Sequence, residues 1–263
     1  MNRPSFRQYL IRGSIWVALG KMVGALAGFF ISAILARVLV PEDMATFFLA
    51  NSIAIFLSLN YRFGLDNLML RLISESLSIN NQLYAKEMVV FGIVVVGAIS
   101  LFSSLILYFG LGSFLISILF PNQFLDPVLG FVIIWAVILA FQFLLGEIFR
   151  AFKEIHLTVL VGGSFTALLS LGLLFALWLF SNQYKLEVVL SLVIIAGVIN
   201  FIIGVVLLNI RMKRIVTHTT ATAKSKKILN GSWPFWVNAV THYTLGFSGL
   251  WILGKYAGGL DVA

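Results

Sequence analysis

The stretch "RGSIWVALGKMVGALAGFFISAILARVLVPEDMA" spans residues 12–45, and "NGSWPFWVNAVTHYTLGFSGLWILGKYAGGLDVA" spans residues 230–263. The two align without a gap at an offset of 218 positions. Each contains a run of about 20 mainly apolar residues, which is the length of helix that crosses a bilayer. The alignment therefore indicates that the second stretch repeats the transmembrane helix predicted in the first stretch. The residues identical in both are Gly13, Ser14, Gly28, Phe29, Ile34, Leu35, Asp43 and Ala45 in the first copy.

The composition indicates an integral membrane protein. The chain is 60% hydrophobic and only 11% charged, and its mean hydropathy is +1.04. Soluble domains are about one quarter charged. The absence of cysteine excludes disulfides and thiolate metal sites. A net charge of +8 favours anionic partners, but in so apolar a chain we expect membrane lipids and no nucleic acid.

Seven apolar runs are long enough to span the membrane, and they show no period-two alternation, so they predict helices and not barrel strands. We expect the second helix to continue through Leu65 to Ile73. Residues 111–120 are too few to span and predict an interfacial turn or a helix extension. The fold class is thus an all-α polytopic membrane protein. The predicted spans are residues 14–40, 45–61, 88–109, 127–146, 157–180, 188–209 and 233–256.

Lys and Arg predict the orientation, because they are enriched in cytoplasmic loops. One side of the predicted membrane carries only Arg37, Lys185 and Lys255, and Lys21 lies within the first span. We therefore expect a cytoplasmic N-terminus, with the first span as an uncleaved anchor. The other basic residues fall on the cytoplasmic side and are Arg3, Arg7, Arg12, Arg62, Arg71, Lys86, Arg150, Lys153, Arg211, Lys213, Arg214, Lys224, Lys226 and Lys227.

The two copies are the first and the seventh span, six positions apart in the order of spans, so both repeated helices enter the membrane from the same side. This is a parallel repeat, an arrangement common in transporters that enclose a site between two bundles. We expect residues 1–210 to form a first six-helix bundle and residues 211–229 to form a basic cytoplasmic linker. Residues 230–263 would then be the first helix of an incomplete second bundle.

Four stretches carry a family resemblance: "LARVLVPEDMATFFLA" (35–50), "GLDNLMLRLISE" (64–75), "GEIFRAFKE" (146–154) and "WILGKYAGG" (251–259). They resemble the polysaccharide exporters, the Wzx-type oligosaccharide-lipid flippases, of the superfamily that includes MATE multidrug exporters. Val40, Met44 and Ala45 depart from the Gly, aromatic residue and Gly of that pattern. The resemblance implies a MATE-like fold of twelve to fourteen spans, so the chain would be C-terminally truncated.

The resemblance also implies a function. The protein would be a secondary transporter that exports undecaprenyl-diphosphate-linked oligosaccharide across the bacterial plasma (inner) membrane, for O-antigen or capsule. The coupling ion, H⁺ or Na⁺, stays open, and a polymerase or glycosyltransferases are possible partners. Alternatives are a MATE-like exporter of organic cations, or a scaffold or inactive fragment in polysaccharide assembly.

Enzyme chemistry has little support in the sequence. His156, His218 and His242 have no metal-ligand spacing. Phosphate-binding loop and nucleophile-elbow motifs are absent from the sequence. We therefore predict no enzyme activity, no catalytic residue, no metal and no cofactor.

Lys21 is the leading candidate for a substrate contact. An ammonium inside a span is costly unless it faces protein, water or a ligand. It lies beside a ridge of small residues that suits close helix packing: Gly20, Gly24, Gly28, Ser32 and Ala36. Lys21 could bind a lipid-linked phosphate in a central cavity, or it could extend to the cytoplasmic interface as a structural residue.

Further charged candidates cluster near the cytoplasmic side. Arg62, Asp66 and Arg71 follow the second span, and any of them could meet an anionic head group. Their simpler interpretation is helical ion pairs, with Arg71 pairing to Glu75. Glu147 and Arg150 close the fourth span, and a solvated helix end is the favoured interpretation for them.

Polar residues within the spans have two interpretations. His242 lies in the middle of the seventh span, one turn after Asn238, and could be a proton site. A hydrogen-bonded core histidine is the favoured alternative. Gln142 and Asn200 are predicted to form interhelical hydrogen bonds.

Overall fold

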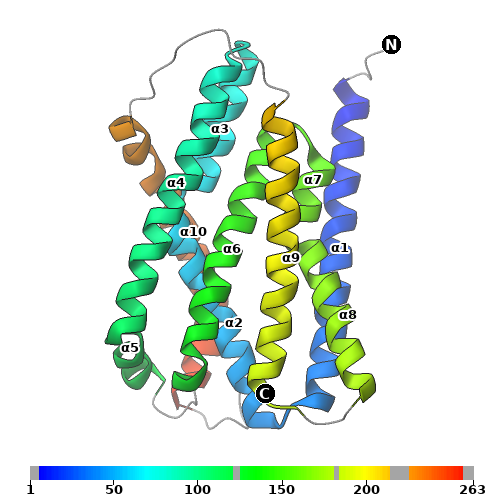
Figure 1. Ribbon diagram of the computed structural model, residues 1–263, viewed down its shortest axis with the longest axis vertical. Coiled ribbons are helices and arrows are strands. Elements are labelled where there is room, and N and C mark those ends of the chain that lie inside the picture. The colour runs from blue at the N-terminus through cyan, green and yellow to red at the C-terminus, as the bar shows by residue number, and fades with distance from the viewer. Residues whose placement is uncertain (1–5, 121–124, 181–183, 214–224, 257–263) are drawn as a thin grey trace.

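The computed structural model describes residues 6–120, 125–180, 184–213 and 225–256, in which every regular element is a helix. Long helices run side by side along the long axis of the molecule (Figure 1). The predicted all-α fold class is confirmed. The elements are α1 (Phe6–Val38), α2 (Pro41–Arg62), α3 (Leu65–Ser78), α4 (Gln82–Ile106), η1 (Leu107–Leu111), α5 (Gly112–Leu119), η2 (Asp126–Val128), α6 (Leu129–Ala151), α7 (Ile155–Val159), η3 (Leu160–Ser164), α8 (Phe165–Phe180), α9 (Leu186–Lys213) and α10 (Ser225–Tyr256).

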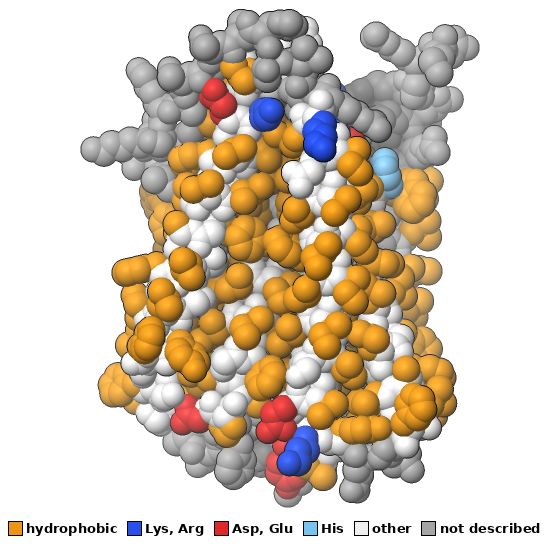
Figure 2. All heavy atoms as spheres, in the orientation of Figure 1, with side chains coloured by type: hydrophobic (Ala, Val, Ile, Leu, Met, Phe, Trp, Pro, Cys, Tyr) orange, Lys and Arg blue, Asp and Glu red, His pale blue; other side chains and the backbone are white. Residues whose placement is uncertain are grey.

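Six helical segments of the described chain are long and apolar enough to cross a membrane. Hydrophobic side chains cover the middle of the face drawn in Figure 2, and charged side chains gather toward its two ends. The seventh predicted span falls in α10, which is not among these six. Its apolar residues are interrupted by polar ones such as Asn238, Thr241 and His242. The six segments are Ser14–Val38, Pro41–Arg62, Gln82–Leu119, Asp126–Ala151, Ile155–Phe180 and Leu186–Lys213.

The helix of the second span ends at Arg62, earlier than the Ile73 that the sequence predicts. The helix expected to continue past Leu65 is broken at Phe63 and Gly64, which have left-handed φ angles of 46° and 71°, so that prediction is wrong. A Cβ atom on Gly64 would lie 2.4 Å from the carbonyl oxygen of Ser232 and 2.7 Å from the backbone nitrogen of Trp236. Glycine therefore allows both the turn and the close approach of α10 to the α2–α3 junction.

α10 is also attached along the length of α2. The Tyr243 hydroxyl donates a hydrogen bond of 2.8 Å to the Ser52 carbonyl, and the Trp251 indole N–H donates one of 3.0 Å to the Ser52 hydroxyl. α1 and α10 both run from the upper to the lower end in Figure 1, as equivalent helices of a parallel repeat would. Residues 214–224 of the predicted linker, and Asp261 and Ala263 of the repeat, lie outside the described residues.

The fifth predicted span, residues 157–180, is interrupted. It starts at Ile155 and breaks in η3, where Gly163 has a φ of 119°. α1 packs against this break: the Ser164 hydroxyl donates to the Gly20 carbonyl at 3.0 Å, and a Cβ on Gly20 would lie 2.2 Å from Cγ1 of Val159. A Cβ on Gly28 would meet nothing within 4 Å. The ridge of α1 therefore serves packing at Gly20 and stays open at Gly28.

Residues 111–120 extend the third predicted span. α5 follows α4 after a bend at Phe109 and Gly110, where Gly110 has a φ of 126°. A positive φ of this size is reached easily only by glycine. The predicted extension is confirmed, and it folds back at the lower end of the bundle in Figure 1.

A buried polar network joins α6, α8 and α9. The Gln142 side-chain amide donates to the Gly197 carbonyl at 2.8 Å. The Asn200 amide donates to the Thr166 hydroxyl at 2.8 Å and to the Val161 carbonyl at 3.1 Å. The prediction that Gln142 and Asn200 hydrogen-bond between helices is confirmed. Such bonds specify how apolar helices pair where lipid gives no hydrophobic driving force.

Candidate functional site

A cavity of about 710 Å³ opens between α1, the upper end of α6 and the α7–η3 segment. Its volume is in the range typical of sites for small ligands. α1 forms one wall, and the broken helix at η3 forms the opposite one. The lining residues are Ser14, Val17, Ala18, Gly20, Lys21, Glu147, Arg150, Ile155, Thr158, Val159, Gly162 and Ser164.

Three charged candidates meet in this cavity. Lys21 projects from α1 and is exposed, while Glu147 and Arg150 come from the last two turns of α6. Arg150 Nη1 lies 3.4 Å from both carboxylate oxygens of Glu147, in the helical pair expected from their spacing. The Arg150 side chain is 59% exposed and that of Glu147 24%. The cavity thus presents two cations and one carboxylate that is already paired, and this balance favours an anionic ligand.

Small polar groups complete the lining. Thr158 and Ser164 face the cavity from the broken helix, and Ser14 faces it from α1. The Thr158 and Ser164 hydroxyls donate to the Glu154 and Gly20 carbonyls, and their lone pairs can still accept hydrogen bonds from the hydroxyls of a sugar. Sequence reasoning missed these residues. The adjacent glycines Gly162 and Gly163 were the available signal, because they mark the break that forms this wall.

Arg62 and Asp66 form a buried ion pair outside this lining. Arg62 Nη1 pairs with Asp66 Oδ2, and Arg62 Nε donates to the Ser58 carbonyl at 3.1 Å. The Arg62 guanidinium lies 4.6 Å from the ring centroid of Phe143. Only 6% of Arg62 and 8% of Asp66 are exposed, so the pair ties the α2–α3 junction to α6. Glu147, which lines the cavity, lies within electrostatic range of both partners.

The remaining candidates lie elsewhere. Arg71 is exposed on α3, and the structure shows no ion pair between it and Glu75. Asn238 and His242 are exposed on α10, and neither makes a hydrogen bond among the described residues. The interpretation of His242 as a hydrogen-bonded core histidine is wrong. Its neighbour Tyr243 bonds to α2, and successive helical residues point about 100° apart, so His242 turns away from the bundle.

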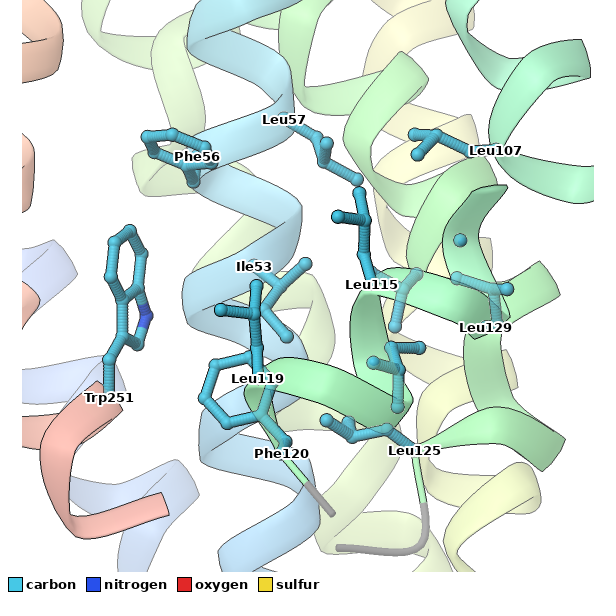
Figure 3. A pocket seen from close by; sticks show the side chains of 13 residues that line it. Ile53, Phe56, Leu57, Leu107, Leu115, Leu119, Phe120, Leu125, Leu129 and Trp251 are labelled. Carbon is cyan, nitrogen blue, oxygen red and sulfur yellow. The ribbon is translucent and has the colours of Figure 1, made fainter. Parts of the chain in front are cut away.

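A second cavity is wholly apolar. It has a volume of about 160 Å³ and lies between α2, the η1–α5 turn, α6 and α10. Figure 3 shows Trp251 of α10 facing Phe56 and Ile53 of α2 across one side of it. Because no charged side chain lines it, this pocket cannot neutralise an anionic group. Within the described ranges, no cluster of three His, Cys, Asp or Glu residues could hold a metal ion.

Comparison with known proteins places this architecture in a family. Residues 10–263 match the family described as "Polysaccharide biosynthesis protein". No curated protein and no solved structure is significantly similar to the chain. The match covers nearly the whole sequence, including the cavity residues Lys21 and Arg150. The chain therefore belongs to the polysaccharide biosynthesis protein family.

Proposed function

We propose that the protein takes part in polysaccharide export as a Wzx-type flippase. It would move an undecaprenyl-diphosphate-linked oligosaccharide from the cytoplasmic to the outer face of the bacterial plasma membrane. The observation that carries this proposal is the meeting of Lys21 and Arg150 in one open cavity of a membrane bundle. Family membership supplies the link to polysaccharide biosynthesis.

The cavity chemistry fits the head of such a substrate. A diphosphate needs cations, and an arginine fork binds phosphate oxygens with directed hydrogen bonds while a lysine acts as a point charge. Arg150 on α6 and Lys21 on α1 supply one of each, and the Thr158 and Ser164 hydroxyls can accept hydrogen bonds from the attached sugar. Rocking of two bundles would expose this site to each side in turn, driven by an H⁺ or Na⁺ gradient.

Export of organic cations is less well supported. A cationic ligand requires carboxylates that are free to pair with it, and Glu147 is the single carboxylate among the cavity residues. That carboxylate already pairs with Arg150. The charge balance of the lining therefore opposes a cation.

Deleting the gene tests the flippase proposal. We expect loss of surface polysaccharide together with accumulation of complete lipid-linked oligosaccharide, because synthesis on the cytoplasmic face continues while transfer stops. Lipid extracts and surface staining give the two amounts, and digestion of intact spheroplasts with an added glycosidase shows on which face the lipid lies. Truncated or missing lipid-linked sugar would instead indicate a glycosyltransferase function and contradict export.

The proposal includes a cytoplasmic N-terminus, which places the Lys21 cavity at the face where the substrate is made. The native chain has no cysteine, so single cysteines report the topology directly. We expect Ser78→Cys, at the end of α3, to react with a membrane-impermeant maleimide only after cell lysis. Lys185→Cys, which precedes α9 at the other end, is expected to react in intact spheroplasts. Both positions are exposed. The reverse labelling pattern would invert the proposed orientation.

A further inference from the structure

A groove is lined by residues of α1 and α8, two helices that run side by side at one edge of the bundle (Figure 1). It has a volume of about 580 Å³ and follows the last third of α1 and most of α8. Aromatic side chains dominate its walls: Phe29 and Phe30 from α1, and Phe175 and Trp178 from α8. Phe29 is 69% exposed and Phe30 is 52% exposed. The groove shares no lining residue with the Lys21 cavity.

One cation stands at the end of this apolar groove. Arg37 lines it from the last turn of α1, and its guanidinium lies 5.5 Å from the ring centroid of Trp178. Arg37 is exposed and forms no ion pair with any described residue. A guanidinium held against an indole face keeps its outward N–H groups free to bind an anion.

The dimensions of the groove match one leaflet of a bilayer. From Phe29 to Arg37 the groove extends ~12 Å along α1 at ~1.5 Å per residue. Half of a ~30 Å hydrocarbon core is of similar length. Lys21 and Arg37 are ~24 Å apart on the same helix axis, so Arg37 lies toward the opposite edge of that core. Trp178 beside it is the residue type that favours the membrane–water interface.

We propose that this groove binds one anionic phospholipid from the leaflet at the Arg37 end. An acyl chain lies between α1 and α8 against the four aromatic rings, and the lipid phosphate pairs with Arg37. A neutral or zwitterionic lipid would fill the groove but gain less from the unpaired guanidinium. The site recognises a single-chain width of hydrocarbon joined to a head group of net negative charge, and it does not depend on what the Lys21 cavity transports.

Gly172 provides a way to block the groove without disturbing the fold. It lines the groove, and a Cβ added there would meet nothing within 4 Å. Leucine is also a better helix former than glycine, so Gly172→Leu fills the groove while α8 stays intact. Gly246 on α10 is the matched control because it too is open within 4 Å and lies away from α1 and α8.

Native mass spectrometry of the purified protein tests the site with two lipids of identical acyl chains, phosphatidylglycerol and phosphatidylcholine. We expect one retained phosphatidylglycerol per chain, held about tenfold more tightly than phosphatidylcholine, as one charge-assisted contact provides. Arg37→Gln should abolish this preference. The control Lys185→Gln removes an exposed cation at the same end and should preserve it. Gly172→Leu should weaken binding of both lipids, whereas Gly246→Leu should leave both unchanged.

Three results would overturn the proposal. Equal retention of the two lipids by the wild type would show that the net negative charge of the head group is not recognised. Unchanged lipid retention in both Arg37→Gln and Gly172→Leu would show that lipid binds elsewhere. A dimer that Gly172→Leu dissociates would show that a second copy of the chain, and not lipid, covers the groove.

Discussion

Replacing Asp66 with leucine is expected to lower the free energy of unfolding by about 3–5 kcal/mol, because it leaves a buried guanidinium without its carboxylate. Arg62 is only 6% exposed, and its other contacts are the Ser58 carbonyl and the Phe143 ring. Neither of these carries a formal charge, and Glu147 acts on Arg62 only as a weaker electrostatic partner than Asp66. Thermal unfolding in detergent, followed by size-exclusion chromatography of the heated protein, measures the loss.

The double variant Arg62→Met with Asp66→Leu distinguishes two contributions to the free energy of unfolding. One is the cost of burying a lone charge, and the other is the net stabilisation by the ion pair. Two apolar side chains of similar size should restore most of the stability, since a buried pair gains little over well-packed hydrophobic groups. Glu154→Gln is the control, because it breaks a more exposed pair in which Arg211 Nε lies 3.1 Å from Glu154 Oε1. That change should cost less than about 1 kcal/mol. An Asp66→Leu cost no larger than the control would contradict the burial of Arg62.

The helices could be predicted from the sequence because an apolar run of membrane length has few other structures available to it. Their breaks could not. The turn at Phe63 and Gly64 fits the backbone of α10, which packs there from the far end of the chain. A local pattern contains no information about that partner. The same limit applies at Gly163, where the fifth span bends against Gly20 of α1.

The candidate site shows the same division between local and long-range information. Lys21 and Arg150 could each be chosen because charge inside or beside a span is expensive. Their meeting in one cavity depends on the packing of α1 against the broken helix, which no spacing in the sequence specifies. His242 shows the same limit. The sequence indicates that it lies in the middle of an apolar run, but not on which face of α10 its side chain lies. That face is fixed by its neighbour Tyr243, which hydrogen-bonds to Ser52 on α2.

The largest functional effect is expected at Lys21. If the cavity holds the diphosphate of a lipid-linked oligosaccharide, Lys21→Ala removes one of its two cations. The remaining one, Arg150, is partly neutralised by Glu147. A hydrogen bond to a charged group contributes about 1.5–3 kcal/mol, so we expect export to fall at least about tenfold. Surface polysaccharide in the deletion strain carrying the variant measures this, and immunoblotting of membranes confirms that the protein is inserted at normal levels.

Lys21→Arg and Lys213→Ala are the controls for the loss of export expected in Lys21→Ala. Arginine keeps the positive charge and should retain part of the export, because phosphate recognition depends on charge more than on the shape of the cation. Lys213 is an exposed cation at the same end of the bundle and does not line the cavity, so Lys213→Ala should export normally.

A lysine that only anchors α1 at the interface predicts a different pattern. In that case Lys21→Ala would be tolerated, since removing a charge from a span eases its insertion. Normal surface polysaccharide in the Lys21→Ala strain would therefore refute a role in substrate binding and leave Lys21 as an interfacial anchor.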